Sequence, residues 1–273
     1  MTVVENNGKP RLRGAATRFI NARLAAGRVA FPLADLVEQP GLSVTAARNQ
    51  LLRLGDSTVR VSPRQQFFLI VGPEHRAMGA PPPAWWLEDY FGWLGHPYYL
   101  ALQSAAETYG SCPQALQRTQ VITNVARRDI EVGRIRVRFF VKRGVSNTPT
   151  QSLANAFAPM RVSTPAATAF DLIRYAARLG GIGRAVETLL PLLPLISVPD
   201  LRRVLEAENE TATTQRLGYI LSTAGRSELA EVVRSSLPAK LTLIPLSPSK
   251  ADRTRGNVVQ LWRIRDNAGD LRL

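Results

Sequence analysis

The chain has 273 residues and a formal net charge of +14, with a sequence pI of about 11.0. Hydrophobic residues make up 45% of it, which excludes a disordered low-complexity chain and leaves room for two domains with a buried core. The basic excess favours a polyanionic partner such as nucleic acid, or an acidic protein, over a generally basic protein with no such partner.

The residues that enzymes and metal sites most often need are scarce. The single cysteine, Cys112, cannot form an intramolecular disulfide, and with only His75 and His96 it cannot supply a usual zinc site or a nucleophile–histidine pair. Asp171 and Glu187 fall on predicted apolar helices, where we expect surface or capping acids rather than a carboxylate pair. We therefore predict a protein that is not an enzyme, with no catalytic residue, no metal and no cofactor.

Neither a secretory signal nor a membrane span is expected. The first 20 residues contain several arginines and no uninterrupted apolar core. The most apolar run, residues 189–198, is too short to span a bilayer and is interrupted by Pro191 and Pro194. These features predict a cytoplasmic protein.

The first predicted element is an amphipathic helix over residues 12–26 that ends at Gly27. Its predicted apolar face consists of Ala16, Phe19, Ile20 and Leu24. A shorter helix opens at Pro32, because proline is favoured in the first turn. A turn over residues 40–42 separates it from a third helix.

The third predicted helix begins at Ser43, a residue type suited to the N-cap, and ends before Gly55. Its predicted apolar face consists of Val44, Ala47, Leu51 and Leu54. The other face carries arginine, asparagine and threonine, which reach phosphates and base edges. Two β-rich runs follow, over residues 58–61 and 67–71, and the turn that joins them has a basic tip at Arg64.

Helix, helix, turn, helix and hairpin in this order predict a winged helix-turn-helix domain over residues 1–78. The predicted DNA-binding residues are Ser43, Thr45, Arg48, Asn49, Arg53 and Arg64. Prolines 81–83 favour an extended linker, so a second domain is predicted over residues 85–273. Trp85, Trp86 and Trp93 at its start are expected in a core or a domain interface rather than stacked on bases.

In the second domain, a helix is predicted from Pro97 to Tyr109, and residues 118–143 are predicted to form β-structure. Arg134, Arg136 and Arg138 alternate there with apolar residues, which places three guanidinium groups on one strand face. Such a face is either solvated or a binding surface. Further helices are predicted over residues 164–177, 182–190, 197–207, 213–224 and 227–237, and strands over 241–246 and 258–264. The predicted fold class is α+β, with an N-terminal winged helix-turn-helix and a larger mixed α/β domain.

Four stretches of the second domain carry a family resemblance. They are YYLALQSAA at residues 98–106, STPAATAFDL at 163–172, QRLGYIL at 215–221, and the tail over 256–267 around Trp262. In this order they resemble the AbiEi antitoxins of AbiE abortive-infection toxin–antitoxin systems. The turn at residues 63–65 departs from the glycine-bearing wing tip expected in front of such a domain.

The resemblance implies a DNA-binding transcriptional autorepressor and antitoxin of a type IV system. Its N-terminal domain would bind inverted repeats in its own promoter. The second domain would counteract a nucleotidyltransferase-like toxin encoded in the same operon, with or without stable binding. The candidate antitoxin residues are Arg134, Arg136, Arg138, Gln215, Arg216, Arg255 and Trp262.

Two other functions fit the residues. One is a winged-helix transcriptional regulator whose second domain senses a small ligand. The other is a nucleic-acid-processing enzyme, against which the missing metal-ligand cluster argues.

Overall fold

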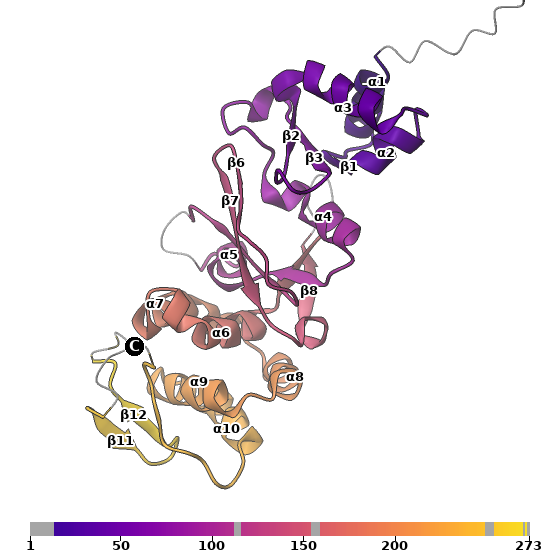
Figure 1. Ribbon diagram of the computed structural model, residues 1–273. Helices are drawn as coiled ribbons and strands as arrows, with labels where there is room; N and C mark the ends of the chain where they lie inside the picture. The colour runs from indigo at the N-terminus through magenta and orange to yellow at the C-terminus, as the bar shows by residue number, and fades with distance from the viewer. Residues whose placement is uncertain (1–13, 112–115, 154–158, 249–253, 270, 272–273) are drawn as a thin grey trace, which may run out of the picture. The chain divides into compact units, whose positions relative to one another are not determined.

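The computed structural model describes residues 14–111, 116–153, 159–248, 254–269 and 271 (Figure 1). Cys112 lies outside these residues. The fold is a mixed α+β fold, as predicted. The chain divides into two compact units, of which the first takes described residues 14–95, 129–137 and 159–160, and the second takes the others. None of the helices described is both long enough and apolar enough to cross a membrane.

The first unit opens with three helices and a three-stranded antiparallel sheet of order β1-β3-β2 (Figure 1). The elements are α1 (Ala15–Ala25), β1 (Ala30–Pro32), α2 (Leu33–Glu38), α3 (Val44–Arg53), β2 (Thr58–Arg60) and β3 (Phe67–Ile70). The three predicted helices and the two predicted strands are all present. Strand β1 was not predicted, because three residues ending in a proline give no alternation to detect.

An aromatic cluster fills the core of this unit. The Phe31 ring packs 5.1 Å from Phe19 and 5.7 Å from Phe68, measured between ring centroids. Two residues predicted on apolar helix faces are exposed instead: Leu24 by 40% and Val44 by 46%. Both lie at helix ends, where periodicity does not tell whether a neighbouring element covers the face.

The tryptophan-rich segment packs on the same unit as helix α4 (Leu87–Leu94). Trp86 is fully buried, and its indole N–H donates to the Pro81 carbonyl at 3.1 Å. Phe67 of β3 contacts Tyr90 and Trp93 with centroid separations of 5.3 and 5.2 Å. The predicted core position of Trp86 is confirmed, whereas Trp93 stays 39% exposed.

A later hairpin returns to the first unit. Strands β6 (Ile130–Val132) and β7 (Ile135–Val141) pair antiparallel around Gly133. The Arg134 N–H donates to the Met78 carbonyl at 2.7 Å. A Cβ atom on Gly133 would lie 2.2 Å from that carbonyl oxygen, and the φ of Gly133 is +56°, so only glycine fits this close approach.

A six-stranded sheet has the order β6-β7-β5-β4-β9-β8. Its other strands are β4 (Tyr98–Leu100), β5 (Thr119–Thr123), β8 (Thr150–Leu153) and β9 (Met160–Ser163). The helix predicted to begin at Pro97 is therefore wrong at its start, because residues 98–100 form a buried strand that pairs with β5 and β9. A short apolar run buried on both faces has no period that separates strand from helix.

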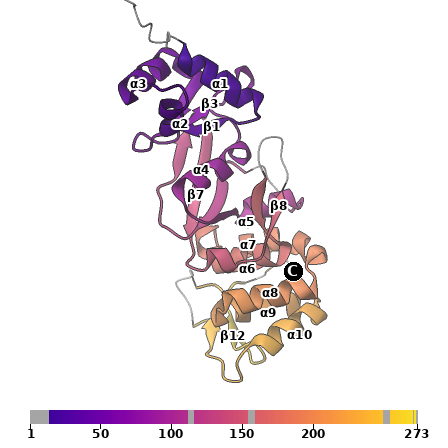
Figure 2. The same ribbon diagram turned by 90° about the vertical axis from the view of Figure 1, so that its right-hand side faces the viewer.

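The second unit contains the remaining helices, among which α8, α9 and α10 lie side by side (Figure 2). The helices are α5 (Leu102–Thr108), α6 (Pro165–Arg174), α7 (Ile182–Leu189), α8 (Val198–Glu208), α9 (Thr211–Thr223) and α10 (Ser227–Ser236). Thr164 and Ser197, the first residues of the two predicted helices, cap α6 and α8 by accepting the N–H groups of Ala167 and Asp200. The helix predicted over residues 164–177 is too long at its end, because α6 ends at Arg174 and Ala177 is exposed.

The C-terminal part forms a small sheet of order β10-β12-β11. Its strands are β10 (Ile244–Pro245), β11 (Asn257–Val259) and β12 (Ile264–Asp266). The single strand predicted over residues 258–264 is wrong, since the chain turns there and Arg263 takes a φ of +48°. Trp262 in this turn is buried.

Candidate functional site

The outward face of α3 carries the predicted DNA-binding residues of the first unit. Ser43 caps the helix, its Oγ accepting the Ala46 N–H at 3.2 Å. All five predicted residues from Ser43 to the end of α3 are exposed, whereas Ala47 and Leu51 are buried on the opposite face. The exposed set is Ser43, Thr45, Arg48, Asn49 and Arg53. Helix α3 contains no acidic residue, so its exposed face carries basic, uncharged polar and apolar side chains and no negative charge.

The β2–β3 hairpin adds two more arginines. Arg64 is exposed in the turn, where its backbone N–H lies 3.4 Å from the acceptor Ser62 Oγ. The Arg60 guanidinium donates to the Pro63 carbonyl at 3.2 Å. The turn is therefore held by local hydrogen bonds and presents cations to solvent.

A groove of about 520 Å³ runs between α3 and the hairpin. Arg48, Asn49 and Leu52 line it from the helix, and Val59 and Arg60 line it from β2. Leu52 is 81% exposed and was not among the predicted DNA-binding residues. The signal was present, because Leu52 follows Thr45, Arg48 and Asn49 at helical spacing.

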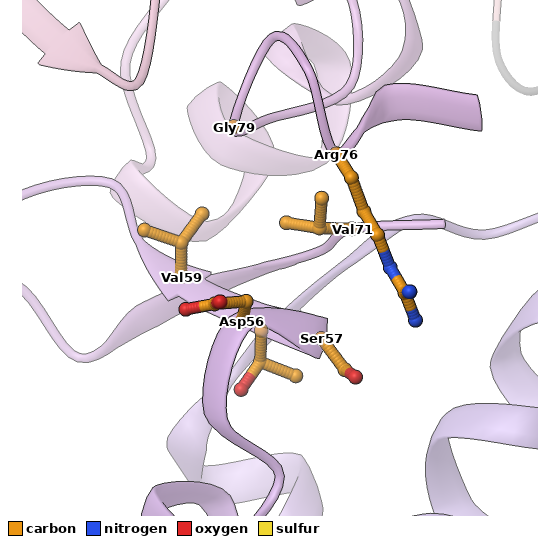
Figure 3. Close-up of a pocket in the computed structure, with 7 residues that line it drawn as sticks. Asp56, Ser57, Val59, Val71, Arg76 and Gly79 are labelled. Carbon is orange, nitrogen blue, oxygen red and sulfur yellow. The ribbon is translucent and has the colours of Figure 1, made fainter. Parts of the chain in front are cut away.

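A second pocket of about 560 Å³ lies beside β2 and the segment that follows β3. Figure 3 shows the Asp56 carboxylate and the Arg76 guanidinium on opposite sides of it, with Val71 between them and Val59 on the side of Asp56. Because the Asp56 and Arg76 side chains do not converge on one point, they do not form a binding site for a charged ligand.

The arginine alternation of the second predicted domain is only partly a strand face. Arg134 lies in the turn before β7, whereas Arg136 and Arg138 lie within the strand. Arg136 donates to the Gly133 carbonyl at 2.9 Å and lies 3.5 Å from the Glu131 carboxylate. Arg138 lies 5.2 Å from the centre of the Phe140 ring.

The other candidate antitoxin residues lie around the C-terminal sheet. The buried Gln215 amide donates to the carbonyls of Trp262 and Thr242 at 2.9 and 3.0 Å. Arg216 donates to the Pro245 carbonyl at 3.2 Å. Gln215, Arg216 and Trp262 therefore attach α9 to this sheet, while Arg255 is exposed.

A buried ionic cluster lies at the heart of the second unit and was not predicted. The Lys142 ammonium, 4% exposed, lies 2.5 Å from Glu208 and 3.4 Å from Asp171. Tyr99 donates to Asp171 at 2.7 Å, and Thr148 donates to Glu208 at 2.9 Å. Asp171, expected as a surface or capping acid, is instead 1% exposed. Its partners Tyr99 and Lys142 lie on β4 and directly after β7, far from Asp171 in the sequence, so sequence spacing cannot reveal them.

Arg174 closes the cluster on its outer side. Its guanidinium lies 2.6 Å from Glu208 and also pairs with Glu210. Burial raises the pKa of Asp171 above its ordinary value, although Lys142 opposes that shift. Burial pushes the pKa of Glu208 upward too, but Lys142, Thr148 and Arg174 outweigh it and hold that pKa below its ordinary value.

Burial, followed by the neighbouring Asp171, raises the pKa of Tyr99 well above its ordinary value, which keeps the phenol protonated as a donor. The charged and hydroxyl groups of this cluster contact one another. Groups that are paired in this way stabilise the fold rather than bind a ligand. No group of three or more histidine, cysteine or acidic residues within the described ranges is placed to hold a metal ion.

Residues 99–223 match the family model of the AbiEi antitoxin C-terminal domain. These residues are referred to below as the AbiEi antitoxin domain, after the family model that they match. The first three stretches that carried the resemblance fall inside or at the edge of the matched residues, and the tail around Trp262 lies beyond them. The buried ionic cluster lies within the AbiEi antitoxin domain and its immediate contacts. A comparison with curated proteins gives no sequence match.

Among solved structures, the chain is similar to the crystal structure of the RV2827C protein from Mycobacterium tuberculosis. The TM-score is 0.66 at 16% identity, covering 97% of this chain and 96% of that one, so the two share a fold. An antigenic nucleotidyltransferase-like protein from Paracoccidioides brasiliensis aligns with a TM-score of 0.36 at 9% identity, over 57% of this chain and 92% of that one.

Close packing requires the glycine in the QRLGYIL stretch at residues 215–221 of the AbiEi antitoxin domain. A Cβ atom at this position would lie 2.2 Å from the Trp262 ring, so α9 can approach the C-terminal turn only through glycine. We expect Gly218→Ala to lower the free energy of unfolding by about 1–3 kcal/mol through overpacking. Urea unfolding measures the change.

Gly92 provides the matched control for that substitution. It is also a helix glycine, it is exposed, and no atom lies within 4 Å of the Cβ it would gain. Gly92→Ala should therefore leave stability unchanged or raise it by up to about 1 kcal/mol. Equal effects of the two substitutions would contradict the packing argument.

Proposed function

We propose that this chain is the antitoxin of a type IV toxin–antitoxin pair and represses its own operon by binding promoter DNA. The AbiEi antitoxin domain supports the antitoxin role. The α3 face supports the DNA-binding role, because it joins a capped helix to exposed groups that can pair with bases and phosphates.

In this proposal, residues 14–71 form a winged helix-turn-helix. Helix α3 enters the major groove, and the β2–β3 hairpin is the wing. Arg48, Asn49 and Arg53 contact base edges or phosphates, and Arg64 contacts a phosphate. Ser43 and Thr45 lie at the helix N-terminus, which favours a phosphate oxygen. Inverted repeats in the promoter would match two copies of the chain.

The mechanism we propose is binding rather than catalysis. The toxin would be a nucleotidyltransferase-like protein encoded in the same operon, opposed by residues 85–273 with or without stable contact. Two experiments test the proposal on the full chain: gel shifts with the DNA upstream of its own operon, and rescue of growth when the adjacent gene is induced. A folded chain that neither shifts that DNA at low salt nor rescues growth would refute it.

The arginines around β7 give a separable test of the antitoxin role. We expect Arg134→Glu/Arg136→Glu/Arg138→Glu to lose growth rescue, because reversing three charges repels an acidic partner or nucleic acid. The cost is several kcal/mol if the contact is buried and much less if it stays exposed. Promoter binding should persist, since α3 is unchanged. Growth under toxin induction and gel shifts measure the two roles.

A charge-matched control is Arg184→Glu/Arg202→Glu/Arg203→Glu, in which three exposed arginines of the second unit are reversed. This control should rescue growth like the parent chain. Protein level and circular dichroism verify that both triple variants fold. Rescue by the β7 variant at normal abundance would rule out these arginines as a toxin-opposing surface.

A further inference from the structure

Leu52 is the most exposed large apolar side chain of the described residues, at 81%. One exposed leucine by itself needs no explanation. This leucine, however, lies within the exposed polar face of α3. Its position therefore raises the question of what an apolar group does on a face otherwise suited to hydrogen bonding.

Helical geometry places Leu52 inside that face, between Arg48 and Asn49. At 3.6 residues per turn, Thr45, Arg48, Asn49, Leu52 and Arg53 span an arc of about 140°. Arg48 lies at one edge, Asn49 and Arg53 lie toward the other, and Leu52 lies between Arg48 and Asn49, next to Thr45. The buried Ala47 and Leu51 point the opposite way. Any surface that Arg48 and Asn49 both contact must also meet Leu52.

The groove beside this face selects the kind of surface that fits. Its walls include Arg48, Arg60, Asn49 and Val59, and no acidic residue lines it. An anionic partner with exposed acceptors is thus complementary to its rim. An apolar group on that partner is complementary to Leu52 and Val59.

We propose that Leu52 reads a thymine of the promoter by contacting its 5-methyl group in the major groove; this inference rests on the proposed function. The four base pairs present only one apolar group at the major-groove edge, the thymine methyl. Arginine and asparagine take the hydrogen-bonding groups of guanine and adenine. Leu52 can form no hydrogen bond, so it selects the methyl and disfavours a cytosine at that position.

The test removes the methyl from the DNA and the leucine from the protein. Promoter DNA is amplified with dTTP or with dUTP, which lacks only the 5-methyl group, and the full chain is titrated by fluorescence anisotropy. We expect the Kd of the parent chain to rise about fourfold for each contacted methyl when uracil replaces thymine. Single-position uracil duplexes then locate the contacted thymine.

Leu52→Ala should bind the thymine DNA as weakly as the parent chain binds uracil DNA, and should not distinguish the two. Leu24→Ala is the matched control, because Leu24 is an exposed leucine of the same unit that lies on α1. It should keep both the affinity and the uracil penalty of the parent chain. Leu52→Met, which keeps an apolar side chain, should keep most of the penalty.

Each other outcome overturns the inference in a distinguishable way. Equal binding of thymine and uracil DNA by the parent chain refutes it and leaves the proposed function standing. No binding of either DNA refutes the proposed function as well. A gain on 5-methylcytosine DNA without a uracil penalty assigns Leu52 to methylcytosine. An equal loss on both DNAs by Leu52→Ala, with a lower mass by light scattering, makes Leu52 a contact between copies of the chain.

Discussion

Replacing Lys142 by methionine should lower the free energy of unfolding by about 3–5 kcal/mol. Lys142 is the most deeply buried cation of the ionic cluster, and its ammonium contacts both Glu208 and Asp171. Methionine keeps a similar volume but leaves two buried carboxylates, Asp171 and Glu208, with Arg174 as their remaining cationic partner. Calorimetric and urea unfolding of the full chain at neutral pH measure the loss.

The loss should shrink as the pH falls from neutral toward about 4, the ordinary carboxyl range. In the parent chain the depressed pKa of Glu208 contributes stability that is present above the pKa of the unfolded state and is lost as the pH falls through the folded pKa. Without Lys142 both acids take up protons at higher pH, which removes the uncompensated charge. The variant therefore approaches the parent chain in acid.

Arg143→Met removes the same charge from the neighbouring, exposed position. It should change the free energy of unfolding by no more than about 0.5 kcal/mol and show no such pH dependence. A Lys142→Met variant as stable as Arg143→Met would show that the cluster contributes nothing to the fold.

The second large effect concerns DNA. Arg48→Ala/Arg53→Ala should weaken promoter binding a hundredfold or more if both arginines contact bases, at roughly 1–3 kcal/mol each. An arginine that contacts a phosphate instead should weaken all sequences alike and flatten the dependence of log K on log salt by about one unit. Both side chains are exposed, so the fold should be unaffected.

Anisotropy titrations at several salt concentrations, on promoter and on unrelated DNA, separate these two cases. Arg76→Ala is the control, because Arg76 is an exposed arginine of the same unit outside α3 and the hairpin. Parent-like affinity and salt dependence in the double variant would show that another element binds the promoter.

Local signals predicted the first unit well. Ser43, Pro32 and Gly55 mark helix ends through short-range chemistry, and the period of α3 separates its buried from its exposed residues. The errors there, Leu24 and Val44, lie where coverage depends on a neighbour. Leu52 was overlooked because an apolar residue at helical spacing was not weighed as part of a polar face.

Contacts between elements that are distant in the sequence determined the features that were not predicted. Residues 98–100 form a strand because β5 and β9 flank them, which no local pattern encodes. Lys142 continues the two-residue spacing of the arginines on β7, yet the structure buries it against Asp171 and Glu208. Regularly spaced basic residues indicate an exposed surface only where no acidic residue of another element packs against them. The sequence spacing does not show whether such an acidic residue is present.

The β6–β7 hairpin also sets the order of events during synthesis. The unit that carries α3 includes residues 129–137, so it stays incomplete until the ribosome has passed well beyond Gly95. At about 5–20 residues per second, synthesis from Gly95 to residue 137 takes roughly 2–8 s. By then β4 and β5 have also been made, and the synthesis of β7 has begun. A nascent chain thus acquires this part of its first unit only together with the first strands of the AbiEi antitoxin domain, and a product cut short at the proline segment would lack part of the first unit and all of that domain.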